Sequence, residues 1–148
     1  MAELMKKILF VDDDHYFARF YVDELRKFFE VVCVYEIGEA LDILRADDSF
    51  SAAIVDVMMP PPIGFEAETH NGASSGIWLL NQVRNEIIQR NLPVIVLSNH
   101  TIRRIEQELD CVSLPSNLIT VSSKVATEPS LLPHLVRAAI ARGIPRNS

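Results

Sequence analysis

Short apolar segments recur along the chain, and each is followed by polar residues. The segment AIV at residues 53–55 shows no alternation of apolar and polar positions, which is typical of a strand covered on both faces, as in a parallel sheet between helices. Four other segments read as strands in the same way. The predicted strands are residues 7–11, 31–35, 53–56, 93–97 and 118–122.

Helical spacing of apolar residues fills the stretches between these strands. Asp14 is a good N-cap for a first helix that runs to about Glu30. Its apolar face is made by Phe17, Tyr21, Leu25 and Phe28. Further helices are predicted at residues 38–46, 77–88, 102–109 and 131–142. Five strands alternating with five helices predict one α/β domain with a parallel sheet, right-handed crossovers and helices on both faces.

The polar residues at the strand ends are the candidates for function. Because the carboxyl ends of parallel strands share one edge of the sheet, we expect these side chains to gather where open α/β sheets bind ligands. Asp56 is held at this rim, since Pro60 prevents its strand from continuing in a paired ladder. The other strand-end candidates are Asp12, Asp13, Ser98 and Lys124.

These side-chain types suit phosphoryl chemistry. Clustered carboxylates repel one another unless a cation joins them. Oxygen ligands of this kind suit Mg²⁺, which binds one or two carboxylates together with phosphate oxygens and water. An aspartate can attack a phosphoryl group and form an aspartyl phosphate, and a nearby hydroxyl and ammonium group would neutralise the remaining phosphoryl oxygens.

Four motifs, FVDDD, IVDVMMP, PVIVLSN and VSSK, follow one another in this order at strand ends. In this they resemble the receiver domain of two-component response regulators, and the resemblance covers nearly the whole chain. It implies a flavodoxin-like, doubly wound α/β fold with five parallel strands in the order 2-1-3-4-5 and helices on both faces.

The resemblance also implies a role for each candidate. Asp56 is the phospho-acceptor. Asp13 corresponds to a direct Mg²⁺ ligand and Asp12 to one that acts largely through water. Asp56 and the backbone carbonyl of Met58 complete the metal site. The switch hydroxyl and the lysine that pairs with the phosphoryl group are matched by Ser98 and Lys124.

The spacing after the acceptor departs from the family pattern. Asp56 lies 20 positions before Gly76, so residues 61–75 form an insertion longer than an ordinary βα connection. We expect this insertion not to pack on its own. Because both of its ends are anchored beside Asp56, we expect it to lie over or near the phosphorylation face.

Two further departures surround the lysine. Val125 follows Lys124 where the family usually has proline in a cis peptide. A cis bond before a non-proline residue costs roughly 2.5 to 4 kcal/mol, so we expect a trans bond and a rearranged loop. Val121 occupies the place where many members carry an aromatic switch residue, so an aromatic rotamer switch is not expected.

Composition and charge narrow the classes of partner. Lys and Arg total 14 against 20 Asp and Glu, a net charge of −6, which argues against binding to nucleic acid or to an anionic membrane. Cys33 and Cys111 have no CxxC spacing and lie in apolar surroundings, so we expect buried free thiols in a cytoplasmic protein. The four histidines show no ligand spacing either.

The sequence therefore predicts a stand-alone receiver domain at residues 1–142, followed by a short polar tail at residues 143–148. Asp56 would take a phosphoryl group from a histidine kinase or a histidine phosphotransfer protein, with Mg²⁺, and lose it by self-catalysed hydrolysis. The chain would be a signalling phospho-acceptor and not a conventional enzyme. Output would pass through contacts with a downstream protein, and self-association as a homodimer is left open.

Two alternatives belong to other classes. Asp12-x-Asp14 imitates the nucleophile motif of haloacid-dehalogenase-like phosphatases, although Tyr16 stands where Thr or Val is usual and no late acidic pair follows Lys124. A receiver-like binding module that is never phosphorylated would keep the acids and signal through protein contacts alone.

Overall fold

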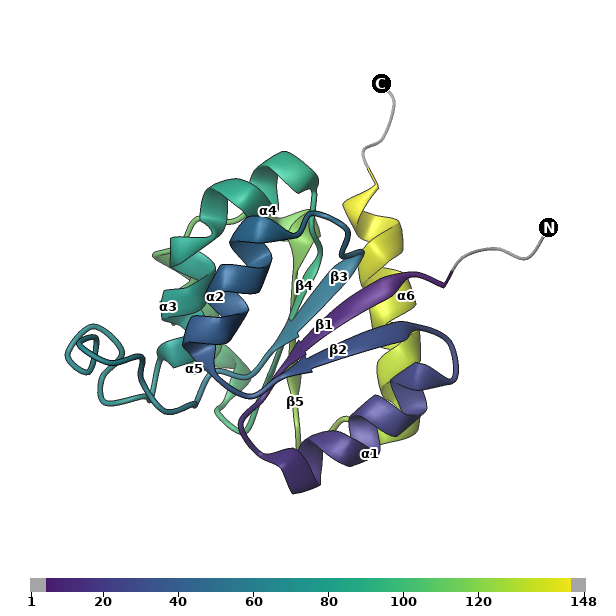
Figure 1. The fold of residues 1–148 in the computed structure, drawn as a ribbon, viewed down its shortest axis with the longest axis horizontal. Coiled ribbons are helices and arrows are strands. Elements are labelled where there is room, and N and C mark those ends of the chain that lie inside the picture. Colours follow the sequence, from purple (N-terminus) through teal and green to yellow (C-terminus); the bar gives the residue numbers. More distant parts are fainter. Residues whose placement is uncertain (1–4, 145–148) are drawn as a thin grey trace.

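The computed structural model describes residues 5–144, and its centre is a sheet of five parallel strands. The strands lie side by side in the order β2-β1-β3-β4-β5 (Figure 1), which confirms the predicted sheet and its strand order. Their bounds are β1 (Lys7–Val11), β2 (Glu30–Val34), β3 (Ala52–Val55), β4 (Val94–Ser98) and β5 (Ile119–Ser123).

Helices cover both faces of the sheet (Figure 1). Within the described residues, α1 and α6 pack on one face, and α2, α3, α4 and α5 pack on the other. Their bounds are α1 (His15–Arg26), α2 (Ile37–Ala46), α3 (Ser75–Gln82), α4 (Arg84–Arg90), α5 (Ile102–Asp110) and α6 (Leu132–Gly143). α6 therefore takes in the first residue of the predicted polar tail, and residues 145–148 lie outside the described residues.

Alternate residues of each strand point to opposite faces and supply two separate cores. Ile8 and Phe10 of β1 belong to the core under α1 and α6, whereas Leu9 and Val11 belong to the core under the other helices. All four residues of β3 are buried. A strand between two helical layers has no solvent-facing side, which explains the lack of polar alternation in the sequence.

The first helix begins as predicted but ends earlier. The Asp14 carboxylate accepts a hydrogen bond of 2.9 Å from the backbone N–H of Phe17, as an N-cap does. Because α1 ends at Arg26, Phe28 lies beyond the helix and is 44% exposed. Its predicted place on the apolar helix face was wrong, and its ring instead contacts the guanidinium group of Arg137.

The single helix predicted at residues 77–88 is two helices, α3 and α4, separated at Val83. Val83 has φ −105° and ψ 18°, which interrupts the helix. Its side chain is fully buried, and the next residue, Arg84, donates hydrogen bonds to the carbonyls of Val112 and Ser113. These contacts are tertiary, and no proline or glycine marks the break, so periodicity predicted five helices where the described chain has six.

The insertion folds into a series of turns, seen as the long loop at the left of Figure 1. The buried Thr69 hydroxyl donates to the Phe65 carbonyl at 2.8 Å, and its oxygen accepts from the Gly72 N–H at 3.2 Å. Phe65 packs on Trp78 of α3, with ring centroids 4.9 Å apart. Residues 63–68 are exposed and the aromatic side chain packs on α3, so the insertion has no core of its own, as expected, and the hydrogen bonds of Thr69 hold its turns.

The end of the insertion is tied to the segment that follows Asp56. The Met59 N–H donates to the Gly72 carbonyl at 3.2 Å, and the Ser75 hydroxyl donates to the Met59 carbonyl at 2.7 Å. Gly72 has φ +96°, and a Cβ at this position would lie 2.5 Å from the Met59 carbonyl oxygen. Only glycine fits this close approach without strain, so the insertion and the segment that follows Asp56 (residues 57–60, called the acceptor segment below) form one unit.

The prediction that both cysteines are buried was wrong. Cys33 is half-buried in β2, which is an edge strand, and Cys111 is exposed directly after α5. Apolar neighbours in sequence do not bury a side chain at a helix end, where the backbone turns it away from the core.

Candidate functional site

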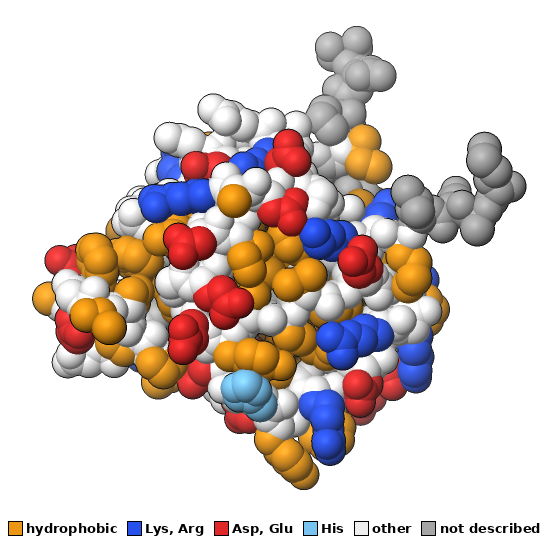
Figure 2. Space-filling model, in the orientation of Figure 1, with side chains coloured by type: hydrophobic (Ala, Val, Ile, Leu, Met, Phe, Trp, Pro, Cys, Tyr) orange, Lys and Arg blue, Asp and Glu red, His pale blue; other side chains and the backbone are white. Residues whose placement is uncertain are grey.

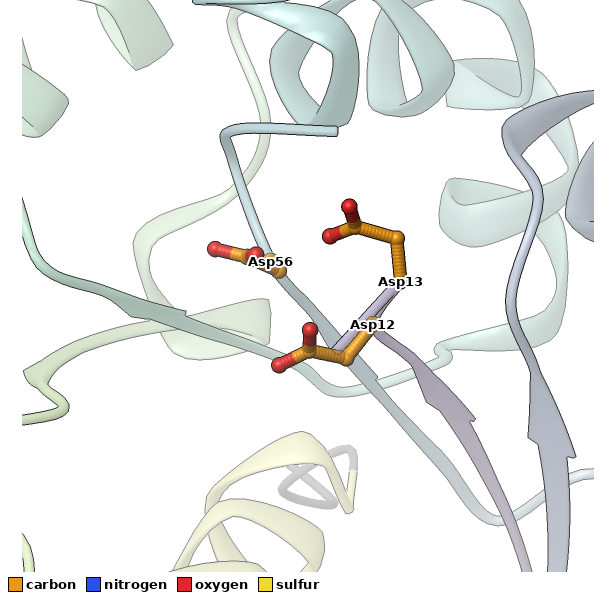
Figure 3. A group of neighbouring side chains, drawn as sticks. All are labelled: Asp12, Asp13 and Asp56. Carbon is orange, nitrogen blue, oxygen red and sulfur yellow. The ribbon is translucent and has the colours of Figure 1, made fainter. Parts of the chain in front are cut away.

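Three aspartates meet at the carboxyl edge of the sheet (Figure 3). β1 and β3 are neighbours and pair Val11 with Val55, so Asp12 and Asp56 emerge side by side. Asp13 follows in the turn before α1. One carboxylate oxygen from each acid lies within 4.8 Å of the others. The structure thus brings together the three acids that the sequence singled out.

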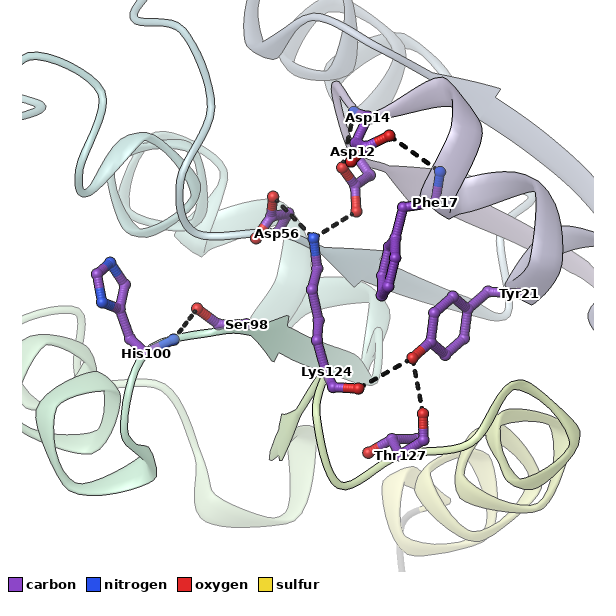
Figure 4. Close-up of polar contacts among 9 residues, drawn as sticks. All are labelled: Asp12, Asp14, Phe17, Tyr21, Asp56, Ser98, His100, Lys124 and Thr127. Carbon is purple, nitrogen blue, oxygen red and sulfur yellow. Dashed lines mark hydrogen bonds and ion pairs between the residues drawn. The ribbon is translucent and has the colours of Figure 1, made fainter.

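Lys124 reaches these acids from the end of β5 (Figure 4). Its Nζ lies 2.8 Å from Asp12 Oδ2 and 3.2 Å from Asp56 Oδ2. The side chain is buried, and the ring of Phe17 in α1 lies 4.8 Å from Nζ. An aromatic face attracts a cation, so α1 contributes to holding the ammonium group between the two carboxylates.

The backbone of Lys124 is held by two neighbouring elements. Its N–H donates to the Ser98 carbonyl at 2.9 Å. The buried Tyr21 hydroxyl of α1 lies 3.2 Å from the Lys124 carbonyl and 2.7 Å from the Thr127 carbonyl. All peptide bonds within residues 5–144 are trans, including the bond before Val125. Tyr21 thus fixes the loop after β5.

Sequence reasoning assigned Tyr21 to the core and did not consider Thr127. Tyr21 is indeed buried, but its hydroxyl serves the site. The available signal was chemical: a buried tyrosine hydroxyl usually needs a hydrogen-bond partner. Nothing in the sequence names that partner, which lies more than a hundred positions away.

Ser98 ends β4 at the same edge of the sheet and is 1% exposed. Its Oγ accepts a hydrogen bond of 3.1 Å from the N–H of His100 (Figure 4). In this arrangement the hydroxyl oxygen is engaged by the loop before α5. The structure therefore places Ser98 at the end of the strand next to β3 and links it to Lys124 through backbone pairing.

The backbone around Met58 leaves one carbonyl oxygen free. The Val57 carbonyl accepts from the Gly76 N–H at 2.9 Å, and the Met59 carbonyl accepts from the Ser75 hydroxyl at 2.7 Å. No residue in the described range 5–144 donates a hydrogen bond to the Met58 carbonyl. The role of this carbonyl as a metal ligand stays a prediction from the resemblance.

The surroundings raise the pKa values of Asp56, Asp13 and Lys124. Burial raises the pKa of Asp56 to about 6, because the attraction of Lys124 offsets only part of the cost of desolvation. Desolvation also raises the pKa of Asp13. Burial lowers the pKa of Lys124, but its hydrogen bond to Asp12 and the charge of Asp56 outweigh this effect and hold the pKa above its ordinary value.

A groove of about 560 Å³ opens beside Asp13. One wall is made by Tyr35 and Glu36 at the end of β2, and the other by residues 60–63, where the insertion begins. The first residues of the insertion therefore lie near the acids, while its later turns pack against α3. The expected position near Asp56 therefore holds for the two ends of the insertion, and its middle part lies against α3.

No family model matches the sequence, and no curated protein matches it. Solved structures do match. The receiver domain of Francisella response regulator 1452 is 22% identical, with a TM-score of 0.69 and with 93% of this chain and 98% of that one covered. A CheY-like receiver domain protein from Methanospirillum hungatei JF-1 is 17% identical, with a TM-score of 0.68 and coverage of 93% and 96%. The BeF3-activated DrrB receiver domain is 17% identical, with a TM-score of 0.68 and coverage of 93% and 99%.

These low identities establish the fold and leave the function to the residues. These three structural neighbours are response regulator receiver domains, and this chain has their fold, with five parallel strands in the order 2-1-3-4-5. None of the helices in the described part of the chain has the length and apolar character needed to cross a lipid bilayer.

Proposed function

We propose that the chain accepts a phosphoryl group on Asp56 and acts as a receiver in two-component signalling. The observation that supports this most directly is the setting of Asp56. Its carboxylate is buried at the strand-end edge, Lys124 Nζ lies 3.2 Å from one of its oxygens, and two further acids lie alongside. A nucleophilic carboxylate with a fixed cation beside it suits phosphoryl transfer to aspartate.

In the proposed transfer, an Asp56 oxygen attacks the phosphorus of a phosphohistidine on a histidine kinase or a phosphotransfer protein. The new P–O bond forms as the P–N bond breaks, and the electron pair of that bond returns to the imidazole, which is protonated. Lys124 pairs with the transferred phosphoryl oxygens. Water later attacks the phosphorus and breaks the bond to Asp56, which restores the carboxylate and releases inorganic phosphate.

The donor set at this edge suits Mg²⁺. Asp12, Asp13 and Asp56 offer carboxylate oxygens within 4.8 Å of one another, and Met58 offers a carbonyl oxygen. All are the hard oxygen donors that Mg²⁺ prefers. A bound Mg²⁺ would neutralise charge on the acids and on the phosphoryl oxygens. The protein contributes by holding the donor oxygens together before the phosphoryl group arrives.

Ser98 is the proposed switch residue. Its hydroxyl oxygen is occupied by the His100 N–H at 3.1 Å. To reach a phosphoryl oxygen on Asp56, the hydroxyl turns toward the acids and the loop before α5 moves with it. Val121 is only partly buried and is not aromatic, so this loop movement, and not a change of aromatic rotamer, carries the signal to a downstream protein.

Support for this reading also comes from one structural neighbour, the DrrB receiver domain, which was solved in a BeF3-activated form. The proposed setting is the cytoplasm, with a histidine kinase or phosphotransfer protein as phosphodonor and a protein as output partner. The chain is in this view a phospho-acceptor that catalyses only its own phosphorylation and dephosphorylation.

The phosphatase alternative is less well supported by the geometry. In that reading Asp14 is the second acid of the catalytic pair. Its carboxylate instead caps α1 by accepting from the Phe17 N–H, and the residue is exposed. An acid committed to a helix cap is poorly placed to act on a leaving group.

The deciding experiment is incubation with acetyl phosphate and Mg²⁺, followed by mass spectrometry of the intact protein and of Asp56→Asn. We expect the mass of one phosphoryl group on the parent chain and none on the variant. Beryllofluoride with Mg²⁺ provides a second readout through the emission of Trp78. Turnover of a small phosphate ester would favour the phosphatase, and no response to either reagent would favour the binding module.

A further inference from the structure

Helix α1 exposes two adjoining aromatic side chains on the side that faces away from the sheet. Tyr16 and Phe20 are 72% and 45% exposed, and their rings meet edge to face with centroids 5.5 Å apart. α1 lies at the lower edge of the molecule in Figure 1, and Figure 2 shows hydrophobic and basic side chains side by side at that edge. Single exposed apolar residues are ordinary, but adjoining ones form a patch of the kind that proteins use for contacts.

Two charged residues share this side of the helix. Arg19 and Asp23 are exposed and lie next to the aromatic pair, because residues three and four apart are neighbours on a helix surface. The residues that α1 buries belong to the opposite side and pack in the core. The four residues Tyr16, Arg19, Phe20 and Asp23 are called the outer face of α1 below.

Both charges of the outer face lack an ion-pair partner within residues 5–144. The spacing of Arg19 and Asp23 allows a pair on one helix, but the Arg19 guanidinium lies over the rings of Tyr16 and Phe20, at 5.8 and 5.6 Å from their centroids. A guanidinium group that contacts aromatic rings keeps N–H donors for a carboxylate. Arg19 and Asp23 are therefore both available to a second molecule.

We propose that the outer face of α1 binds the same face of a second copy of this chain, with the two helices antiparallel about a two-fold axis. In such a contact each interaction occurs twice, so Arg19 of each copy pairs with Asp23 of the other. The axis passes close to Phe20, and the two Phe20 rings pack on each other. A face with one cation and one anion beside an apolar centre is complementary to itself in charge, as a contact between identical copies requires.

The contact is small, because one helix packs against one helix. Interfaces below about 1,200 Å² belong to weak and transient complexes, so we expect a dissociation constant on the order of 100 µM. The proposal does not rest on phosphorylation, and the full chain is therefore tested without metal or phosphodonor. Sedimentation velocity from about one tenth to about ten times that constant should show a mass that rises toward twice the monomer mass.

Charge reversal tests the pairing across the axis. Arg19→Asp brings acids together in both halves of the contact, and Asp23→Arg brings arginines together, so each variant alone should be monomeric over the same range. In a 1:1 mixture of the two variants, every acid of one copy meets an arginine of the other. The mixture should therefore form dimers with an affinity within about tenfold of the parent.

Phe20→Ser tests the apolar centre and should weaken association by about tenfold or more. Phe28→Ser is the matched control and should leave association unchanged. Phe28 is 44% exposed, against 45% for Phe20, and its ring also contacts an arginine, Arg137, but it lies beyond the end of α1.

Three results would overturn the proposal: a monomer at every concentration, a 1:1 mixture of the charge variants that stays monomeric, or equal effects of Phe20→Ser and Phe28→Ser. A monomeric parent would leave the outer face to a partner of another kind. If the thermal melt of a variant shows that it does not fold, the amide resonances of the parent decide. They should shift with concentration in α1, and shifts centred on another element would contradict the proposed contact.

Discussion

Asp56 and Lys124 are in contact, yet their surroundings act on their charges in opposite ways. Burial disfavours the charged form of Asp56, whereas two acids favour the charged form of Lys124. One ammonium group does not neutralise three carboxylates, so the metal-free cluster keeps a net negative charge. Because like charges held together repel, this cluster is poised to take up a cation.

Replacing Asp56 should change stability as well as phosphorylation. The native Asp56 pKa is about 6, against an ordinary value of 3.8. Between these values the folded chain holds a proton that the unfolded chain releases, so the free energy of unfolding falls as pH rises through this window. Asp56→Asn has no carboxylate that must ionise in the buried site. Its free energy of unfolding at neutral pH in EDTA should therefore exceed that of the parent by about 1 to 3 kcal/mol.

Urea melts at several pH values between about 4 and 7 check this. Asp14→Asn is the matched control, because it removes an exposed acid directly after Asp13 of the same site and Asn remains a good N-cap. A stability difference between Asp56→Asn and the parent that does not change with pH would contradict the assignment of the raised pKa to Asp56.

The two acids of the β1–α1 turn should differ in their effect on the metal. Asp12 is already engaged: Oδ2 is held by Lys124 at 2.8 Å, and Oδ1 accepts from the Asp14 N–H at 2.9 Å. We therefore expect Asp13→Ala to weaken Mg²⁺ binding more than Asp12→Ala. Calorimetric titration of both variants measures this order, and equal affinities would speak against a direct ligand role for Asp13.

At the scale of elements, Lys124 is positioned by α1 as much as by its own strand. Phe17 and Tyr21 lie on the face of α1 that packs toward the loop after β5, and the Tyr21 hydroxyl contacts two carbonyls of that loop. Helix α1 therefore has two roles. It packs on the sheet, and it positions the side chain of Lys124.

Tyr21→Phe should test the second task. The change keeps the ring and leaves the Lys124 and Thr127 carbonyls without their donor, which should cost about 1 to 3 kcal/mol of stability. We also expect slower phosphorylation by acetyl phosphate, because the lysine is held less firmly. Tyr16→Phe removes a hydroxyl from a side chain that is 72% exposed and should change neither quantity. A Tyr21→Phe variant with parent-like stability and rate would remove the hydroxyl from this role.

The insertion offers a second test at the scale of elements. Gly72 and Gly64 both have positive φ, but a Cβ on Gly72 would meet the Met59 carbonyl at 2.5 Å, while a Cβ on Gly64 would meet no atom within 4 Å. Both alanine variants share the backbone strain. Gly72→Ala should therefore be destabilised by about 1 to 3 kcal/mol more than Gly64→Ala.

Because Gly72 is hydrogen-bonded to the acceptor segment, we also expect Gly72→Ala to change the half-life of phospho-Asp56. Urea melts and the decay of the phosphorylated protein measure the two effects. If both variants lose the same stability and keep the parental half-life, the insertion is not coupled to the acceptor segment.

At the scale of the whole molecule, the parallel sheet determines which residues meet. Every strand ends at the same edge, and the order β2-β1-β3-β4-β5 places the strands that carry Asp12 and Asp56 next to each other. Helices on both faces bury these strands, so the site sits on a rigid base. Its acids are exposed to ligands only at the rim.

Metal binding should therefore stabilise the whole domain. Mg²⁺ at 100 times its dissociation constant should raise the free energy of unfolding by about 2.7 kcal/mol, provided that it binds only the folded chain. Chemical denaturation in Mg²⁺ and in EDTA measures the difference. Asp13→Ala should lose most of this gain at the same Mg²⁺ concentration. Equal stability of the parent with and without Mg²⁺ would contradict the proposed metal site.

The sequence by itself determined the strands and the edge at which the site lies. Apolar segments without polar alternation, such as residues 53–55, are typical of strands buried on both faces, and their alternation with helices favours a parallel sheet. Since parallel strands end at one edge, the pattern placed the acids after β1 and β3 at the same edge of the sheet, and they meet because these two strands are neighbours. The strand order followed from the resemblance to receiver domains, not from the pattern itself.

Only the tertiary structure decided the contacts between distant segments. The break at Val83, the place of Tyr21 under the loop of Lys124 and the turns around Thr69 each depend on residues far apart in the chain or on backbone hydrogen bonds. Such contacts produce no periodic pattern and no local bias in composition, so a single sequence does not show which residues make them.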